Sequence, residues 1–363
     1  MATLSGAVPD APGTAVAAPV SVSILGASGY VGGEFLRLAL GHPHLRVAQV
    51  SSREHAGYPV HIVHPNLRNV TDLRFTKPDD LEPVDVLVSA MPHGGLARSI
   101  GQWEPFAQRV LVDLSEDFRL ASADAYARFH AEPHSSPELL GRFVPAIPEL
   151  SRDALRGATR VAGAGCIATT AILGLAPVVR ADLLNTERDV IVDAKIGSSA
   201  AGKEVSLASH HPERAGAVRT YAPVRHRHQA EIKQALPGAP RVHLSATAIE
   251  RVRGVLATAH TFVRPGVEES DVLAAFRAAY DDEPFVRLVR ARRGVHRVPD
   301  PRILDGSNYC DVGFSLDTGT GRLVILSALD NLVKGAAGHA LQALNVALGY
   351  PEAAGLGFTG LHP

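Results

Sequence analysis

The sequence has few cysteines, no long apolar run and almost no excess of charge of either sign. Only Cys166 and Cys310 are cysteines, so a disulfide framework is excluded and a reducing compartment, by default the cytoplasm, is expected. No stretch approaches the roughly 20 uninterrupted apolar residues that a membrane-spanning helix needs. A net charge of -1 excludes general nucleic-acid binding. The composition is therefore that of an ordinary soluble globular protein.

The length of 363 residues predicts two domains. Residues 1–19 are rich in Ala, Pro and Gly without the pattern of a signal peptide, and predict a flexible tail. Strands alternate with helical segments over 20–163, which predicts a parallel, doubly wound sheet and a Rossmann-type α/β domain. The strands expected there are Val20–Leu25, Leu45–Val50, Val84–Ala90 and Val110–Leu114.

Longer candidate strands follow and predict a mainly β, α+β catalytic domain over 164–330. They are Asp189–Ile196, Val242–Ala248 and Gly254–Val263, followed by a hairpin with its turn at 317–321. A long helix over 330–348 is expected to return to the first domain within a C-terminal segment, 331–363.

A glycine-rich turn interrupts the first strand and the helix that follows it. Gly26, Gly29 and Gly32 are the residues that a tight turn, a close approach to pyrophosphate and close helix packing require. The context predicts a dinucleotide site, and the alternative is a purely structural turn.

Ser51, Ser52 and Arg53 follow the second strand, where an NAD-selective site usually has an acidic residue. Hydroxyl and guanidinium groups bind a 2′-phosphate that a carboxylate would repel, so the segment favours NADP. The alternative is that Arg53 is an ordinary exposed charge.

Cys166 lies where a glycine-rich turn opens an apolar helix. A helix N-terminus lowers a cysteine pKa and so favours the nucleophilic thiolate. The alternative is a small buried hydrophobic residue, which is the interpretation we keep for Cys310.

The 17 histidines raise the question of metal binding. His210 and His211 are adjacent and cannot share one ion on a regular element, and the run 225–228 is too basic to attract a cation, so no metal site is expected. Either His226 or His228 is a candidate acid/base partner for Cys166, with Glu231 close enough to orient it. The alternative is solvated surface charge.

Six ordered motifs together resemble the N-acetyl-γ-glutamyl-phosphate reductase family, from about Val20 to the C-terminus. They lie at residues 26–32, 91–94, 113–119, 165–166, 226–231 and 330–338. The segments 61–68, 209–216, 294–297 and 357–363 resemble its lysine-biosynthesis branch, which reduces aminoadipyl 6-phosphate held on a small acidic amino-group carrier protein. Ile167 departs from that branch, where asparagine follows the cysteine.

The resemblance implies a semialdehyde dehydrogenase type of fold with a catalytic and dimerisation domain, and a homodimer or homotetramer. It also implies that Cys166 is the nucleophile, that Asn331 lies beside the nicotinamide and that His228, rather than His226, is the acid/base. The NADP site that it implies consists of Ser28, Gly29, Tyr30 and Val31 together with Ser51, Ser52 and Arg53.

The carrier implied by the resemblance is acidic, so a basic rim is expected on the second domain. Three alternatives stay open: the arginine-pathway reductase acting on free N-acetylglutamyl phosphate, an enzyme serving both pathways, and a cysteine hydrolase or acyltransferase. The rim candidates are Lys203, Arg214, Arg219, Arg225, Arg227, Arg287, Arg290, Arg292, Arg293 and Arg297.

Overall fold

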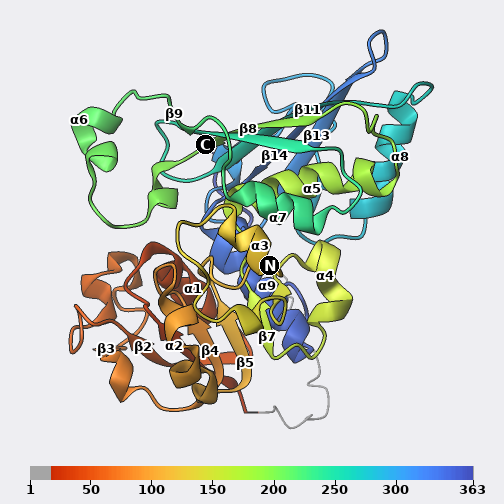
Figure 1. Cartoon of the computed structure of the whole chain (residues 1–363). Coiled ribbons are helices and arrows are strands. Elements are labelled where there is room, and N and C mark those ends of the chain that lie inside the picture. Colours follow the sequence, from red (N-terminus) through yellow and green to blue (C-terminus); the bar gives the residue numbers. More distant parts are fainter. Residues whose placement is uncertain (1–17, 363) are drawn as a thin grey trace, which may run out of the picture.

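The computed structural model describes residues 18–362, so the tail predicted over 1–19 lies almost entirely outside the described residues. The chain forms two seven-stranded sheets, one in each half of the molecule (Figure 1). Within the described range, no helix combines the length and the apolar character that crossing a membrane would require.

The first sheet is parallel throughout, with strand order β3-β2-β1-β4-β5-β7-β6. Parallel neighbours need crossover connections, which the alternating strands and helices supply. The predicted doubly wound α/β fold is confirmed. Its strands are β1 (Val20–Leu25), β2 (Leu45–Ser51), β3 (Phe75–Thr76), β4 (Val84–Ser89), β5 (Ala107–Asp113), β6 (Val144–Pro145) and β7 (Arg160–Ala162), and its helices are α1 (Tyr30–Leu40), α2 (Gly95–Trp103), α3 (Ala123–Ala127) and α4 (Pro148–Leu155).

The second sheet is mixed, with strand order β12-β13-β14-β11-β8-β10-β9. Buried and less buried residues alternate along β8 and β11, because one face of the sheet packs on α5 in a common apolar core. The predicted hairpin is confirmed between β13 and β14. The strands are β8 (Val190–Ile196), β9 (Arg219–Ala222), β10 (Val242–Ala248), β11 (Val255–Phe262), β12 (Val286–Leu288), β13 (Cys310–Asp317) and β14 (Arg322–Leu329), and the helices are α5 (Cys166–Arg180), α6 (His211–Arg214), α7 (His228–Ala235) and α8 (Glu269–Tyr280).

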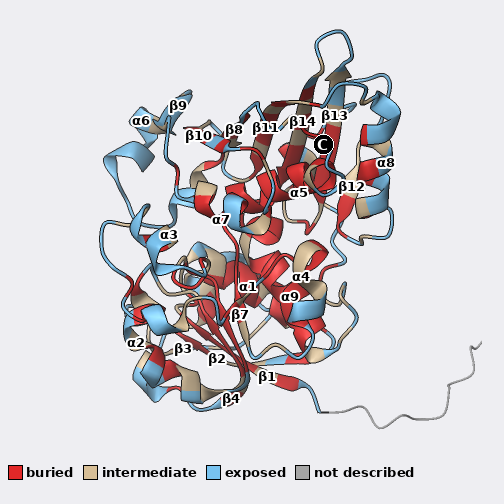
Figure 2. Cartoon of the chain, turned by 45° about the vertical axis from the view of Figure 1, so that its right-hand side comes forward, coloured by how far each residue is buried: buried red, intermediate tan, exposed pale blue. Residues whose placement is uncertain are grey.

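The predicted continuous helix over 330–348 is wrong at its start. The Asp330 side chain accepts the backbone N–H groups of Leu332 and Val333, and a π-helical turn, Val333–Ala337, precedes α9 (Gly338–Leu348). α9 shares an apolar core with the first sheet and is buried over almost its whole length (Figure 2). The chain therefore returns to the first sheet after completing the second.

A fully buried ion pair holds the π-helical turn against α4. The Lys334 ammonium lies 2.5 Å from the Glu149 carboxylate, and both side chains are 0% exposed. Burial alone would raise the pKa of Glu149, but Lys334 outweighs it and keeps that pKa below its ordinary value. The Gln342 amide donates a further hydrogen bond to Glu149. Removing one charge would leave the other unpaired in the interior.

We expect Lys334→Met to lower the free energy of unfolding by about 3–5 kcal/mol, because it leaves the Glu149 carboxylate unpaired in the interior. Urea denaturation at pH 7 measures this loss. The matched control is Arg156→Met, which breaks the exposed pair with Asp153 (66% and 91% exposed) and should cost less than about 1 kcal/mol. Equal losses in the two variants would contradict the role given to the buried pair.

Candidate active site

Cys166 is the first residue of α5, as expected from the sequence. β7 ends at Ala162, and Gly163 is tied to the neighbouring strand by its N–H, which donates to the Asp113 carbonyl at 2.7 Å. Gly165 is the N-cap of α5, with an extended backbone. Strand β7 of the first sheet thus leads through a short turn to Cys166, at the start of a helix that packs on the second sheet.

His228 is the first residue of α7 and lies directly over Gly165. A Cβ at residue 165 would come within 2.4 Å of the His228 Nε2 atom. Only glycine leaves room for the imidazole beside Cys166. No described hydrogen bond joins the Cys166 sulfur to a histidine, and the buried Nδ1 atom of His228 has no hydrogen-bond partner among the described residues.

The Glu231 carboxylate joins the cysteine loop to the histidine helix. One oxygen accepts the Gly165 N–H at 2.8 Å, and the other lies 3.8 Å from His228 Nε2. The side chain is buried. The sequence predicted that Glu231 orients the histidine, and the structure adds a direct contact with Gly165, the residue before Cys166.

Arg119, the last residue of the motif 113–119, also belongs to the site, although the sequence assigned it no role. Its Nε donates to the Gly163 carbonyl at 2.8 Å, and its Nη1 lies 3.5 Å from Glu231. The guanidinium therefore holds both the cysteine loop and the buried carboxylate. Its position in the motif 113–119, next to a buried strand, was the available signal.

His226 is also buried, but its contacts differ from those of His228. Its Nδ1 accepts the backbone N–H of His228 at 3.2 Å, and its Nε2 lies 3.3 Å from the Tyr221 hydroxyl. The two imidazole rings meet edge to face at 4.7 Å. His226 thus satisfies a free N–H at the start of α7, while His228 faces the cysteine loop.

Burial dominates the electrostatics of these groups. It raises the pKa of Cys166 to about 11, although the Arg119 guanidinium opposes the shift. Burial also lowers the pKa of His228 well below its usual value, with a further contribution from His226. The site at neutral pH therefore contains a thiol and a neutral imidazole, rather than the thiolate that the helix start alone predicts.

Asn331 and Gly335 bring the end of the second sheet to the same place. The Asn331 side chain accepts the Gly254 N–H at 2.7 Å and donates to the Ser199 hydroxyl at 3.0 Å. A Cβ at residue 335 would lie 2.6 Å from the Cβ of Cys166, so the π-helical turn passes against Cys166. The sequence indicated Asn331 but not this close approach.

The glycine loop has the shape that a dinucleotide pyrophosphate requires. Gly26 has a φ of +80°, and a Cβ there would lie 2.8 Å from the Ala90 carbonyl oxygen. A Cβ at Gly32 would lie 2.8 Å from the Gly26 carbonyl oxygen. The space beside Gly29 is open, with the nearest atom at 3.8 Å, and the first turn of α1 contains no acidic residue. The loop therefore fits the phosphates of a dinucleotide.

The serines after β2 contact this loop. The Ser52 hydroxyl donates to Ser28 at 3.0 Å, while the fully buried Ser51 hydroxyl accepts the Gly26 N–H at 3.4 Å. Arg53 is exposed beside them. Ser51 and Ser52 are thus buried and contact the glycine loop, and Arg53 is the exposed residue of the three.

A cavity of about 480 Å³ lies between the start of α1 and the second domain. Tyr30 lines it from the start of α1, and Ser199 and Leu332 line it from beside Asn331. Val31 follows Tyr30 in the first turn of the helix. Of the residues predicted to bind the cofactor, Tyr30 lines this cavity directly, and Asn331 lies next to its lining residues Ser199 and Leu332.

Some of the residues expected to form the basic rim are already paired with carboxylates. Arg227 pairs with Glu116 at 2.5 Å, and Arg287 pairs with Asp311 at 2.6 Å. Lys203 lines the cavity beside the glycine loop, and Arg225 is exposed. Besides Lys203, the exposed candidates without an ion pair among the described residues lie in two places: Arg225 follows β9, in the segment that projects from the second domain (Figure 1), and Arg292, Arg293 and Arg297 lie after β12.

Two domain families match the chain: the semialdehyde dehydrogenase NAD binding domain over residues 21–186 and the semialdehyde dehydrogenase dimerisation domain over 166–331. The dimerisation match supports assembly of more than one copy. Among solved structures, aspartate semialdehyde dehydrogenase II of Vibrio cholerae shares the fold, with a TM-score of 0.67 at 16% identity over 92% of this chain and 99% of its own. The Candida albicans aspartate semialdehyde dehydrogenase solved with NADP has a TM-score of 0.67 at 14% identity over 91% and 98%.

Sequence relatives are much more similar. The LysW-L-2-aminoadipate 6-phosphate reductase of Deinococcus radiodurans is 54% identical over 94% of this chain and 98% of its own length. A protein of Thermomicrobium roseum named as a putative reductase of the same kind is 51% identical over 95% and 99%. With its nicotinamide dinucleotide domain and a cysteine at the start of α5, the chain is an oxidoreductase, and it belongs to the LysW-aminoadipate 6-phosphate reductases within the semialdehyde dehydrogenase family.

Proposed function

We propose that this chain reduces aminoadipyl 6-phosphate, held on an amino-group carrier protein, to the semialdehyde, with NADPH as the reductant and Cys166 as a covalent nucleophile. The observation that carries the proposal is the packing of His228, Glu231 and Arg119 around the loop that presents Cys166. The similarity to the Deinococcus radiodurans reductase over almost its whole length supports the substrate. Lysine biosynthesis in the cytoplasm is the setting that we infer.

The first step removes the proton of the Cys166 thiol. The raised pKa means that a base is needed, and the neutral His228 beside Gly165 can accept this proton. The sulfur then attacks the acyl carbon, the bond from that carbon to the phosphate oxygen breaks, and inorganic phosphate leaves. The product is a thioester on Cys166.

Negative charge develops on the carbonyl oxygen during this attack. In this proposal the backbone N–H groups of the first turn of α5 stabilise that charge, and the partly buried Arg119 guanidinium adds a fixed positive charge. Glu231 keeps Arg119 and Gly165 in place through its two oxygens. The same groups are available when the thioester is reduced.

NADPH, when bound, supplies the hydride that reduces the thioester to the aldehyde. The chain's own contribution is the cavity beside Tyr30 and Leu332, which would hold the cofactor between the glycine loop and the second domain. His228, protonated in the first step, gives its proton to the developing oxygen and accepts it again as the bond from carbon to sulfur breaks and the aldehyde leaves. It then returns the proton to the Cys166 sulfur, which restores the thiol and the neutral imidazole.

A carrier-bound glutamyl phosphate is the second candidate substrate. A protein of Natronomonas pharaonis, 48% identical over 94% of this chain and 98% of its own length, is named as a putative reductase of both the aminoadipate and the glutamate forms. The two acyl chains differ by one methylene, which a pocket distinguishes by only about 1–3 kcal/mol. An enzyme that serves both pathways is therefore the alternative. Membership in an oxidoreductase family argues against a cysteine hydrolase.

A comparison of three substrates tests the proposed reaction: carrier-bound aminoadipyl phosphate, carrier-bound glutamyl phosphate and free N-acetylglutamyl phosphate. We expect the highest kcat/KM for the first, with about a 10- to 200-fold advantage over the second. Equal values for the two carrier-bound substrates would indicate the double function. A preference for the free substrate would contradict the role of the carrier.

The Cys166→Ala variant tests the role of the cysteine. It should lower turnover roughly a thousandfold or more and leave NADPH binding unchanged.

The ionisation of Cys166 can be measured by its reaction with iodoacetamide. Because only the thiolate reacts and the pKa lies near 11, the rate should rise about tenfold per pH unit between pH 7 and pH 9. Mass spectrometry of the labelled peptide gives the rate. The Cys166→Ala variant is the control, since Cys310 is fully buried. A rate that levels off below pH 8 would contradict the dominance of burial.

The cofactor preference depends on Arg53. We expect Arg53→Ala to raise the KM for NADPH about tenfold and to leave that for NADH almost unchanged, because NADH lacks the 2′-phosphate. Steady-state kinetics with both cofactors measures the difference. Arg109→Ala, an exposed arginine within β5, is the matched control. An equal effect on both cofactors would remove the basis for NADP selectivity.

A further inference from the structure

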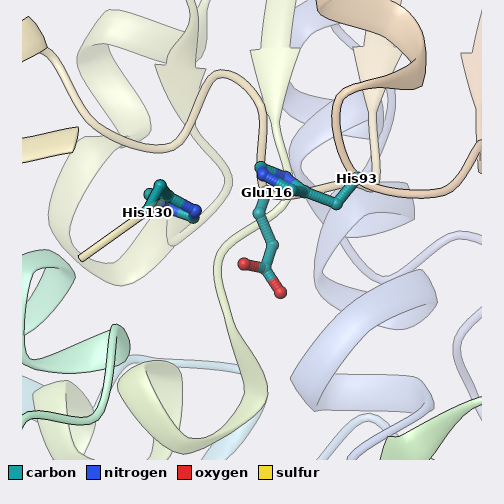
Figure 3. A group of neighbouring side chains, drawn as sticks. All are labelled: His93, Glu116 and His130. Carbon is teal, nitrogen blue, oxygen red and sulfur yellow. The ribbon is translucent and has the colours of Figure 1, made fainter. Parts of the chain in front are cut away.

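Three potential metal ligands meet outside the cysteine site. His93 lies between β4 and α2, Glu116 follows β5, and His130 follows α3. One ligand atom from each lies within 4.8 Å of the other two. Figure 3 shows the ends of the three side chains around a common space. None of them belongs to the histidine runs that the sequence brought forward.

His93 is held in the orientation and tautomer that a metal ligand needs. Its Nδ1 lies 3.0 Å from Asp117, whose carboxylate also accepts the N–H groups of Gly94 and Ala97. Because this carboxylate already acts as an acceptor for two backbone N–H groups, we assign the His93 proton to Nδ1 and the lone pair to Nε2. The Tyr126 hydroxyl lies 3.0 Å from Nε2 and is its present partner. A carboxylate behind the imidazole is the usual second partner of a metal-bound histidine.

The surroundings leave room for an ion. The three residues line a cavity of about 410 Å³. The His130 side chain makes no hydrogen bond among the described residues and stacks on His93, with the ring centres 4.8 Å apart. Glu116 pairs with Arg227 through one oxygen. Each side chain thus has a donor atom that is free or held by one exchangeable contact.

We propose that His93, Glu116 and His130 bind a divalent transition-metal ion of the zinc type, with Asp117 orienting His93. Two imidazoles and one carboxylate form a ligand set that suits such an ion, with water in the fourth position. Bonds of about 2.1 Å in a tetrahedral site bring the donors to about 3.4 Å from one another. Binding therefore requires His130 to turn and Glu116 to exchange Arg227 for the ion.

This exchange would reach the cysteine site. Arg227 directly precedes His228. Its positive charge is one of those that oppose the rise of the Cys166 pKa caused by burial. Releasing Arg227 from Glu116 changes a contact at the start of α7. The ion site is nevertheless separate from the nucleophile, and its occupancy can be tested without the reductase reaction.

Cobalt titration tests the proposal. The full-length chain without a histidine tag, carrying Cys166→Ala to remove the thiol as a competing ligand, is titrated with Co²⁺, and the visible absorption of the bound ion is recorded. We expect one equivalent to bind and to be displaced by Zn²⁺. His130→Gln should weaken binding about tenfold or more, and Asp117→Asn about 10- to 100-fold.

The control is His243→Gln, an exposed histidine paired with Asp189 on the second domain. It should leave Co²⁺ binding unchanged. Absence of binding by the Cys166→Ala chain would overturn the proposal, as would equal affinities in the His130→Gln and His243→Gln variants. His130 is partly exposed, so its replacement tests the site even if the Asp117 variant fails to fold.

Discussion

The buried carboxylate of Glu231 is the contact on which the geometry of the cysteine site depends. It accepts the N–H of Gly165, faces Arg119 and lies beside His228. A carboxylate in such a place is costly unless its oxygens are satisfied. Here the Gly165 N–H and the Arg119 guanidinium oppose the effect of burial, which still raises the pKa of Glu231. The contacts hold the loop before Cys166 and the helix that carries His228 in place relative to each other.

Two close approaches depend on the absence of a side chain. Gly165 makes room for the His228 ring, and Gly335 lets the π-helical turn pass against Cys166. Lys334 anchors this π-helical turn, because its ammonium group donates hydrogen bonds to Glu149 and Gln342. A chain segment that ends the second sheet is thus fastened into the first domain, with the nucleophile between the two.

The sequence was most informative where the pattern is local. The strand Val242–Ala248 was predicted with the bounds that it has, and the glycine loop and the helix start at Cys166 follow from adjacent residues. The contact between Arg119 and Glu231 joins residues 112 positions apart, which no local pattern encodes. The π-helical turn was missed because its apolar residues fit an α-helical period, and the difference depends on how the Asp330 side chain caps the turn.

The protonated state of Cys166 has a consequence for the lifetime of the enzyme. Peroxides and other oxidants attack cysteine as the thiolate, and their attack leads through sulfenic acid to irreversible products. A thiol whose pKa is raised by burial to about 11 presents very little of that form at neutral pH. In the proposed reaction His228 takes this proton when the acyl phosphate is attacked, so between turnovers the thiol form would protect Cys166 from oxidation.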